Sequence, residues 1–347
     1  MPRLTSLLAA SALLLVSLPA QGRGGRGGDS KPVELHNFTF TQKSFHSDAV
    51  AQDMPYGIYL PKDYDAADKK DVQWPVVIWL HGMFEDHMRF HGRGVGAPVL
   101  DQAVTDGKLP PCVFVLANGG RTSMYINAGK GAEYQDLIEK DLVTHINKTY
   151  RVRQDRQGRA LMGISMGGMA ALRIGFTDPS LFGTIAVHSS AVFPVDPEQL
   201  PDNIKGAAKR FGFSDVFGDP IDKDKWAATN PLGIAGKLEP KTLDGLRIWF
   251  DAGTEDRYRF GDTNQQLHEV LEQKKVPHTW TLVKGGGHAW GSGFHESSLV
   301  ASLTFVGSGF QPAKDKGATA PAPAAATGDA KAAPAVKPAG GKSGEGH

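Results

Sequence analysis

The sequence predicts an α/β protein built around a mostly parallel, doubly wound β-sheet. Short, nearly continuous apolar runs recur along the chain, and such runs are typical of strands that are buried on both faces of a parallel sheet. Segments with a helical spacing of apolar residues lie between them. Strand and helix therefore alternate, which is the pattern of this fold class. The runs are residues 75–80, 112–117, 160–164, 184–187 and 246–250.

The other elements follow in chain order. Residues 33–45 and 54–60 alternate apolar and polar side chains, which predicts two antiparallel strands ahead of the parallel ones. A last strand is expected at residues 278–283. Residues 191–245 interrupt the alternation with Pro, Gly and aromatic residues, and we interpret them as an insertion over the carboxyl edge of the sheet, above the active site. Helices are expected at residues 99–106, 133–150, 168–176, 263–274 and 297–305.

Length and composition indicate one folded domain between a leader and a tail. Residues 1–20 combine Arg3 with an apolar run, which predicts a secretory signal peptide and a secreted or periplasmic protein. Leu18 is large for a cleavage site, so a retained anchor stays open as an alternative. Residues 21–31 form a Gly/Arg-rich linker, and residues 311–347 contain no Phe, Trp or Tyr, which predicts a disordered Ala/Pro/Lys-rich tail. The folded domain is therefore expected at residues 32–310.

The net charge, the length of the apolar runs and the cysteine count argue against several classes of protein. The 347 residues carry a net charge of +1, and 22% of them are charged, which argues against a nucleic-acid binder. Beyond the leader no apolar run is long enough for stable membrane insertion. Cys112 is the only cysteine, so an internal disulfide is impossible. No cofactor is implied, and the oligomeric state is left open.

The central motif is Gly-x-Ser-x-Gly at residues 163–167, where a predicted strand meets a predicted helix. This context predicts a nucleophile elbow, a sharp turn that holds Ser165 in a strained backbone conformation. Glycines are needed on both sides, because a Cβ there would collide with the neighbouring strand or helix. The motif alone is weak, so the prediction depends on finding partner groups at other strand ends.

A histidine and a carboxylate follow the last two predicted strands. His288 comes after residues 278–283 and three glycines, and it follows the serine in the order that this turn requires. We expect His288 to be the base, with His188 as second choice. Three acids follow residues 246–250; Asp256 lies beyond a glycine turn and is favoured as the acid that orients the histidine. Asp251 and Glu255 are then structural acids.

Two backbone amides are expected to form the oxyanion hole. The Met166 amide follows the nucleophile, and Gly82 allows the turn that aims the Met83 amide inward. Aromatic side chains in the surrounding loops, together with His188, are candidates for substrate contact. These candidates are Phe84, Tyr125, His188 and Trp290.

Four motifs together resemble the esterase D family of α/β-hydrolases. The resemblance covers about residues 33–305 and implies an α/β-hydrolase fold with Ser165 as nucleophile, Asp256 as acid and His288 as base. It also implies Met83 and Met166 as oxyanion donors. Residues 117–123 depart from the family, in which many members carry an aspartate or a further glycine. The motifs are Leu80-His81-Gly82, Gly163-Ile164-Ser165-Met166-Gly167-Gly168, Gly253-Thr254-Glu255-Asp256 and Gly285-Gly286-Gly287-His288.

The resulting hypothesis is a serine carboxylic-ester hydrolase that acts through an acyl-enzyme. Its expected partner is a small-molecule or polysaccharide-linked ester, carbohydrate-linked or phenolic, as for feruloyl and acetyl xylan esterases. The alternatives are acyl transfer to a carbohydrate, a siderophore esterase, and a non-catalytic envelope binding protein on a hydrolase scaffold. A metal-dependent hydrolase using His87 and His91, spaced i,i+4, is a further alternative. We expect no metal site.

Overall fold

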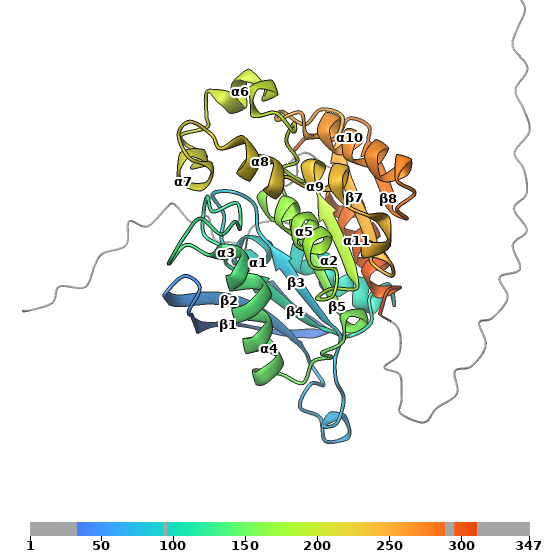
Figure 1. The fold of residues 1–347 in the computed structure, drawn as a ribbon. Helices are drawn as coiled ribbons and strands as arrows, with labels where there is room; N and C mark the ends of the chain where they lie inside the picture. Colours follow the sequence, from blue (N-terminus) through green and yellow to red (C-terminus); the bar gives the residue numbers. More distant parts are fainter. Residues whose placement is uncertain (1–32, 93–95, 289–294, 311–347) are drawn as a thin grey trace, which may run out of the picture. The chain divides into compact units, whose positions relative to one another are not determined.

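The computed structural model describes residues 33–92, 96–288 and 295–310, which form an eight-stranded sheet with helices on both faces (Figure 1). The strand order is β1-β2-β4-β3-β5-β6-β7-β8. Neighbours from β4 to β8 are parallel, whereas β1 pairs antiparallel with β2 and β2 with β4. The predicted fold class is therefore confirmed. The strands are β1 (Phe38–Ser47), β2 (Gln52–Pro61), β3 (Val76–Leu80), β4 (Val113–Ala117), β5 (Arg159–Ile164), β6 (Thr184–His188), β7 (Arg247–Gly253) and β8 (Thr279–Val283).

The order in which the chain adds strands reverses at β3, near the centre of the sheet, and this determines where a site can form. The chain passes from β3 outward to β4 and then returns to β5, on the other side of β3. Loops that leave the carboxyl ends of β3 and β5 diverge there, and ligands of α/β sheets bind in the crevice that results. Ser165 follows β5 at this point.

Two apolar layers cover the faces of the sheet. One face packs against α1 (Arg89–Gly92), α2 (Gly96–Thr105) and α11 (His295–Gly307). The other packs against α5 (Met166–Thr177), α10 (Phe260–Gln273) and a helical stretch with a π-helical centre. That stretch comprises α3 (Tyr134–Asp136), η2 (Leu137–Leu142) and α4 (Val143–Thr149). Among the described residues, no helix is long and apolar enough to cross a membrane.

The first strand begins later than the sequence predicts. Residues 33–37 were expected to be part of it, but β1 starts at Phe38, which pairs with Pro61 at the end of β2. The Asn37 carbonyl still accepts the Lys62 amide just after β2, but the amides of His36 and Asn37 donate to the carboxylate of Asp101 on α2. The side-chain cap replaces ladder hydrogen bonds where the sheet ends.

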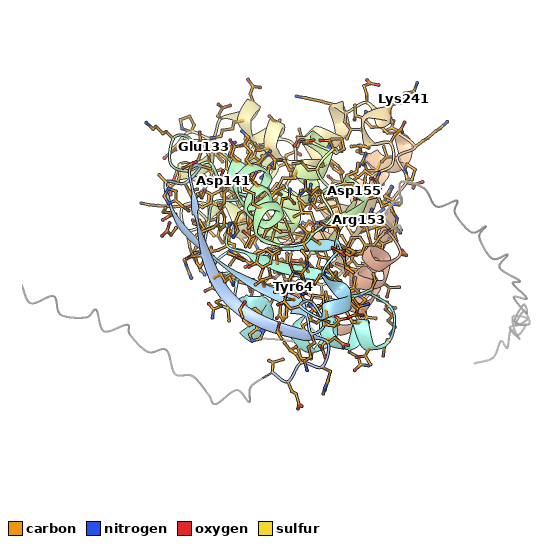
Figure 2. All side chains as sticks on the ribbon, turned by 90° about the horizontal axis from the view of Figure 1, so that it is seen from below. Tyr64, Glu133, Asp141, Arg153, Asp155 and Lys241 are labelled. Carbon is orange, nitrogen blue, oxygen red and sulfur yellow. The ribbon has the colours of Figure 1, made fainter. Side chains whose placement is uncertain are left out.

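The turn into β5 is fixed by an ion pair between a buried arginine, Arg153, and an exposed aspartate, Asp155 (Figure 2). Arg153 is buried and donates from Nε and Nη2 to the two carboxylate oxygens of Asp155, at 2.9 and 2.7 Å. Asp155 also accepts the amide of Gly158 at the end of η3 (Arg156–Gly158). This arrangement sets the start of the strand that leads to Ser165.

The segment between β6 and β7 covers the carboxyl edge of the sheet, as predicted for residues 191–245. Ile204, Phe211 and Phe213 from this segment line the same cavity as Ser165. Trp226 is fully buried among its aromatic rings and donates from Nε1 to the Pro194 carbonyl at 2.9 Å. Its helices are η4 (Pro197–Gln199), α6 (Asp202–Lys205), α7 (Phe213–Phe217), α8 (Lys223–Thr229), α9 (Pro231–Lys237) and η5 (Pro240–Leu243); η1 (Ala67–Lys69) lies elsewhere, before β3.

Replacing Trp226 tests whether this segment is part of the cooperative core. Trp226→Ala removes ring contacts to Phe193, Phe213 and Phe217 and leaves a cavity, so we expect a loss of about 3–5 kcal/mol in unfolding free energy. Urea unfolding followed by circular dichroism measures it. Val195→Ala, at an exposed position of the same segment, is the control and should change stability by less than about 0.5 kcal/mol. Equal stability of the two variants would contradict the expectation.

Candidate active site

Ser165 lies on the turn between β5 and α5 with φ 54° and ψ −115°. A Cβ on Gly163 would lie 2.5 Å from the Gly167 carbonyl oxygen, and one on Gly167 would lie 2.2 Å from that of Leu80. Both positions therefore exclude any residue larger than glycine. The turn has the geometry of a nucleophile elbow, and it exposes the serine side chain at the sheet edge.

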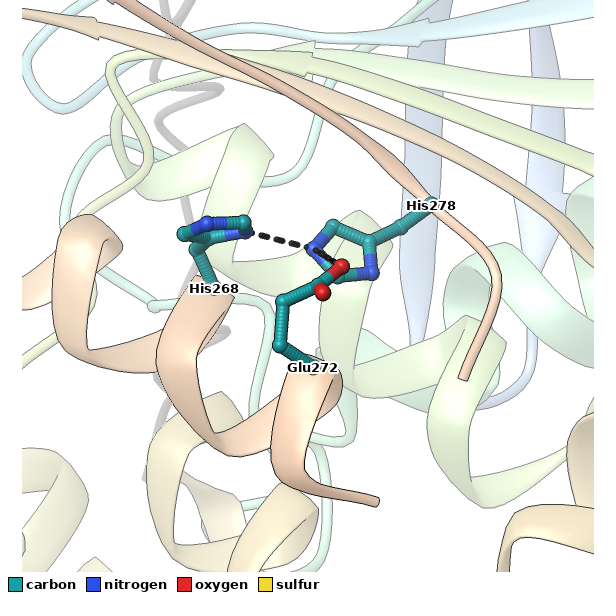
Figure 3. A group of neighbouring side chains, drawn as sticks. All are labelled: His268, Glu272 and His278. Atoms are coloured by element: carbon teal, nitrogen blue, oxygen red, sulfur yellow. Dashed lines mark hydrogen bonds and ion pairs between the residues drawn. The ribbon is translucent and has the colours of Figure 1, made fainter. Parts of the chain in front are cut away.

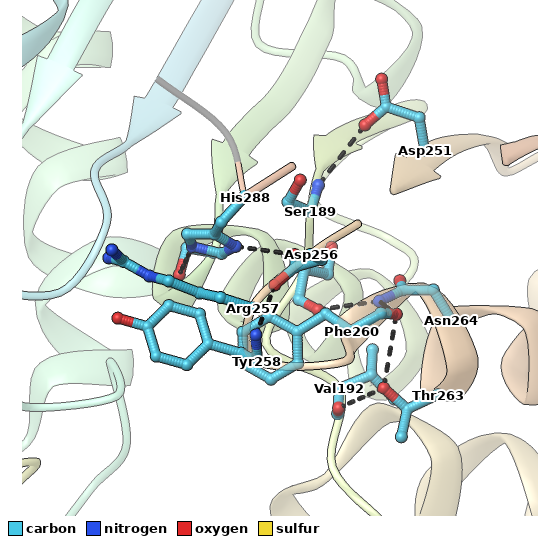
Figure 4. A network of polar contacts seen from close by, with 12 residues as sticks. Ser189, Val192, Asp251, Asp256, Arg257, Tyr258, Phe260, Thr263, Asn264 and His288 are labelled. Atoms are coloured by element: carbon cyan, nitrogen blue, oxygen red, sulfur yellow. Dashed lines mark hydrogen bonds and ion pairs between the residues drawn. The ribbon is translucent and has the colours of Figure 1, made fainter. Parts of the chain in front are cut away.

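His288 and Asp256 extend from Ser165 in one hydrogen-bonded chain, and Figure 4 shows the contact between the first two. His288 Nε2 is 3.0 Å from Ser165 Oγ, and His288 Nδ1 is 2.8 Å from Asp256 Oδ2. An ionised carboxylate only accepts, so Nδ1 carries the proton and Nε2 is left to accept from the serine. The second oxygen of Asp256 accepts the Tyr258 amide at 2.8 Å. The structure thus brings together the three residues that the sequence predicts as a triad.

Aromatic rings hold the imidazole of His288 in this position. Tyr258 meets it edge to face, with ring centroids 4.9 Å apart, and Phe260 lies at 5.5 Å. Both rings come from the loop and helix start that follow Asp256. The acid and the rings that fix the base are therefore supplied by one short segment.

The competing acid at the end of β7 has a different partner. Asp251 is fully buried and lies 3.2 Å from His188 Nδ1, while His188 Nε2 lies 2.9 Å from Ser302 Oγ on α11. This group joins β6, β7 and α11 and does not reach Ser165. Glu255 is exposed. The expectation that Asp251 is a structural acid agrees with these contacts, whereas the same expectation for Glu255 stays a prediction.

Met83 and Met166, the residues whose amides are predicted to form the oxyanion hole, both lie beside Ser165. Met166 is the first residue of α5, so its N–H has no acceptor within the helix. Met83 lies in the loop after β3, and among the described residues no acceptor takes its N–H. Both residues line the cavity on which Ser165 opens. The geometry fits a pair of oxyanion donors.

His81 and Glu85 fix the loop that carries Met83, a role that was not predicted for either side chain. His81 Nε2 accepts the Gly119 amide at 3.1 Å, which leaves Nδ1–H to donate to the Gly82 carbonyl at 2.8 Å. Burial lowers the pKa of His81 to about 4, so the ring is neutral at pH 7. Glu85 accepts the Gly82 amide and is paired with Arg89; burial raises the pKa of Glu85, opposed by that arginine.

The cavity has a volume of about 280 Å³, and its lining includes six Phe or Tyr rings and three arginines. Phe84, predicted as a substrate contact, lines it. Arg210 lies over the Phe84 ring at 5.2 Å, and Arg257 lies over the Tyr258 ring at 4.8 Å. The other aromatic wall residues are Phe193, Phe211, Phe213 and Phe260.

Two other predicted substrate contacts are wrong. Tyr125 is fully buried beneath the loop after β4, so close that a Cβ on Gly119 would lie 1.8 Å from its ring. The His188 ring lies on the face of the sheet that α11 covers, against Trp249. Only its backbone serves the elbow, since its carbonyl accepts the Ser165 amide at 2.9 Å. Trp290 lies outside the described residues.

His87 and His91 have separate partners. His87 Nε2 contacts Gln42 at 3.1 Å, whereas His91 Nδ1 contacts the Tyr59 hydroxyl at 2.8 Å and stacks on Phe40. In the part of the chain that the structure describes, they belong to no group of three metal-ligating side chains. A metal-dependent hydrolase built on this pair is not supported.

The family model "Esterase: Putative esterase" matches residues 47–305, which is most of the chain. The chain belongs to the esterase family. It is 27% identical over 219 residues to an endo-1,4-beta-xylanase/feruloyl esterase of Xylanibacter ruminicola, covering 62% of this chain and 28% of that protein. It is 24% identical over 265 residues to an esterase of Mycobacterium tuberculosis, covering 70% of this chain and 54% of that one. The chain thus spans between a quarter and just over half of these relatives.

Solved structures share the fold. A ferulic acid esterase superposes with a TM-score of 0.65 at 22% identity, covering 79% of this chain and 99% of that structure. An S-formylglutathione hydrolase from Agrobacterium tumefaciens gives a TM-score of 0.60 at 16% identity, covering 80% and 99%. These likenesses confirm the predicted α/β-hydrolase fold.

The depressed pKa of His81 predicts a loss of stability in acid. The unfolded imidazole binds a proton below about pH 6.5, whereas the folded one does so only near pH 4, so stability is lost as the pH falls through this window. At pH 4 the loss from this residue is about 3 kcal/mol. His81→Gln should therefore lose less unfolding free energy between pH 7 and pH 4 than the original chain, by urea unfolding. His46→Gln, at an exposed imidazole, is the control. Equal pH dependence of the original chain and His81→Gln would contradict the assignment.

Proposed function

We propose that the chain is a carboxylic-ester hydrolase in which Ser165 forms a covalent acyl-enzyme. One observation carries the proposal: the hydrogen-bonded series from Ser165 through His288 to Asp256 opens on a cavity that Met83 and Met166 also line. The family and the relatives named as esterases support carboxylic ester hydrolysis as the activity.

In the proposed reaction His288 Nε2 removes the proton of Ser165 as Oγ attacks the ester carbonyl carbon. The carbonyl π electrons move to the oxygen, which the amides of Met83 and Met166 stabilise. The bond to the alcohol oxygen then breaks, and His288 returns the proton to the departing alcohol. Water repeats the sequence on the acyl-enzyme and releases the acid. Asp256 stays ionised and holds the imidazole in the tautomer that accepts the serine proton.

The loop around Met83 determines how well the developing oxyanion is stabilised. Losing one such donor costs about 2.7–4 kcal/mol in comparable sites. His81 and Glu85 act as positioning residues, because they hold the Gly82 carbonyl and amide and so set the direction of the next amide. Neither needs to contact the substrate.

The proposed substrate is a carbohydrate-linked or phenolic ester. The cavity is at the small end of the range for small-molecule sites, which fits a compact acyl group with the alcohol portion outside. Its aromatic walls suit a planar phenolic acid, since offset and edge-to-face ring pairs stabilise such contacts. A relative is named as a xylanase/feruloyl esterase and another as an acetyl esterase. Export, expected from residues 1–20, fits a substrate outside the cytoplasm.

Removing the serine hydroxyl tests the nucleophile. Ser165→Ala should lower the kcat for p-nitrophenyl acetate by roughly 10⁶-fold, because no acyl-enzyme forms. A fluorophosphonate probe should label the original chain and not the variant. Ser180→Ala, at an exposed serine in the turn after α5, should retain full activity and labelling. Undiminished turnover in Ser165→Ala would refute the proposal.

Removing one aromatic wall tests the acyl group. Phe211 comes from the covering segment, is half-buried and lines the cavity. Phe211→Ala should lower kcat/KM for methyl ferulate by about tenfold, because a ring contact of up to about 1.5 kcal/mol is lost. The acetyl ester should change by less than about threefold, because its acyl group does not reach that wall. Phe40→Ala removes a ring outside the cavity and is the control. An equal loss for both esters would argue against a phenolic acyl group.

A further inference from the structure

Three side chains with metal-ligating atoms converge away from the candidate active site (Figure 3). His268 and Glu272 are four residues apart on α10, so they lie on one face of that helix. His278 lies just before β8 and faces both of them (Figure 3). His268 Nδ1 is 2.8 Å from His278 Nε2, and Glu272 Oε1 is 3.9 Å from the same nitrogen. The ligand atoms of all three lie within 4.8 Å of one another.

The ring of His278 is held so that the lone pair of its Nε2 points toward His268 and Glu272. Its Nδ1 lies 2.7 Å from the Val276 carbonyl, which can only accept, so Nδ1 carries the proton and Nε2 is the acceptor. Metal-bound histidines have the same arrangement, with the second ring nitrogen donating to a carbonyl or carboxylate. The side chain is 1% exposed and stacks on Phe250, so its orientation is fixed by packing.

Glu272, the third member of the cluster, leaves the cluster open to solvent. The side chain of Glu272 is 64% exposed, which gives an ion a route to the buried nitrogen of His278. Two imidazoles and one carboxylate form a donor set that binds Zn²⁺ with a fourth position for water. Tetrahedral ligands at the usual Zn–N distance of about 2.0–2.1 Å are about 3.3 Å apart. The two separations at His278 Nε2, 2.8 and 3.9 Å, lie on either side of this value.

We propose that His268, Glu272 and His278 bind one Zn²⁺ ion, which clamps the end of α10 to the start of β8. Binding replaces the hydrogen bond between the two rings with one bond from each ring to the metal. His268 changes to the tautomer with the proton on Nε2, so the neutral pair releases no proton. Rotation of the exposed Glu272 side chain brings its carboxylate to the ion.

The proposed ion stabilises the fold and takes no part in ester hydrolysis. The cluster lies at the amino end of β8, whereas His288 follows the carboxyl end of that strand. His268 lies eight residues beyond the start of α10, about 12 Å along the helix. α10 follows Asp256 and β8 precedes His288, so the clamp joins the two segments that carry these residues.

The test is Zn²⁺ binding by chelator-treated, untagged full chain, since a polyhistidine tag binds the same ion. Isothermal titration calorimetry with zinc chloride should give one site per chain with a dissociation constant in the micromolar range, and zinc should raise the melting temperature by several degrees. Glu272→Gln removes a ligand at an exposed position and should weaken binding at least about tenfold. His268→Gln should abolish the site. Glu269→Gln, on the same helix and outside the cluster, is the matched control and should bind as the original chain does.

Binding that is absent, or that is equal in all variants, would overturn the site and leave His268 and His278 as a hydrogen-bonded structural pair. Chelation should leave the turnover of p-nitrophenyl acetate unchanged at a temperature well below the melting point. Loss of turnover on chelation, restored by zinc, would overturn the purely stabilising role. Neither result depends on the identity of the ester substrate.

Discussion

The backbone conformation of Ser165 is the constraint on which the rest of the site depends. A non-glycine residue at φ 54° and ψ −115° costs of order 1–3 kcal/mol and persists only where surrounding contacts enforce it. Those contacts come from the next strand: the Ser165 amide donates to the His188 carbonyl, and the Ser165 carbonyl accepts the Ala191 amide, both at 2.9 Å. The turn is therefore fixed by β6 as well as by its own glycines, and the proposed nucleophile requires an intact sheet centre.

The group formed by His188, Asp251 and Ser302 extends this constraint to the other face of the sheet. It is buried, and it joins the carboxyl ends of β6 and β7 to α11. The loops that leave these two strands carry Ala191, which holds the elbow, and Asp256, which holds His288. This polar group does not reach the cavity, yet it fixes the strand ends from which the loops of Ala191 and Asp256 begin. Removing one member would leave buried partners without hydrogen bonds, a cost of about 1–3 kcal/mol for each group.

Local rules explain how much could be predicted from the sequence. Buried parallel strands read as apolar runs, and an elbow needs glycines at fixed positions, so the sheet and Ser165 could be found without contacts. The face of the sheet toward which each strand side chain points could not be predicted. A strand that is buried on both faces has no alternation of apolar and polar residues that would distinguish them. His188 is therefore predicted at the correct strand end as a substrate contact, although its side chain contacts Ser302 on α11. Phe211 lies in an irregular segment, where no periodicity links an aromatic residue to the cavity.

The walls of the cavity differ in how closely they are tied to the reacting groups. Tyr258 and Phe260 contact the imidazole of His288 as well as lining the cavity, so any change in their shape also moves the proposed base. Phe211 contacts Phe84, Phe213 and Tyr258 and has no ring contact with the imidazole among the described residues. The covering segment can therefore change which acyl group fits while the hydrogen-bonded series stays in place. In the proposed reaction, selectivity for the acyl group therefore depends on the covering segment, because Tyr258 and Phe260 are needed to position the proposed base.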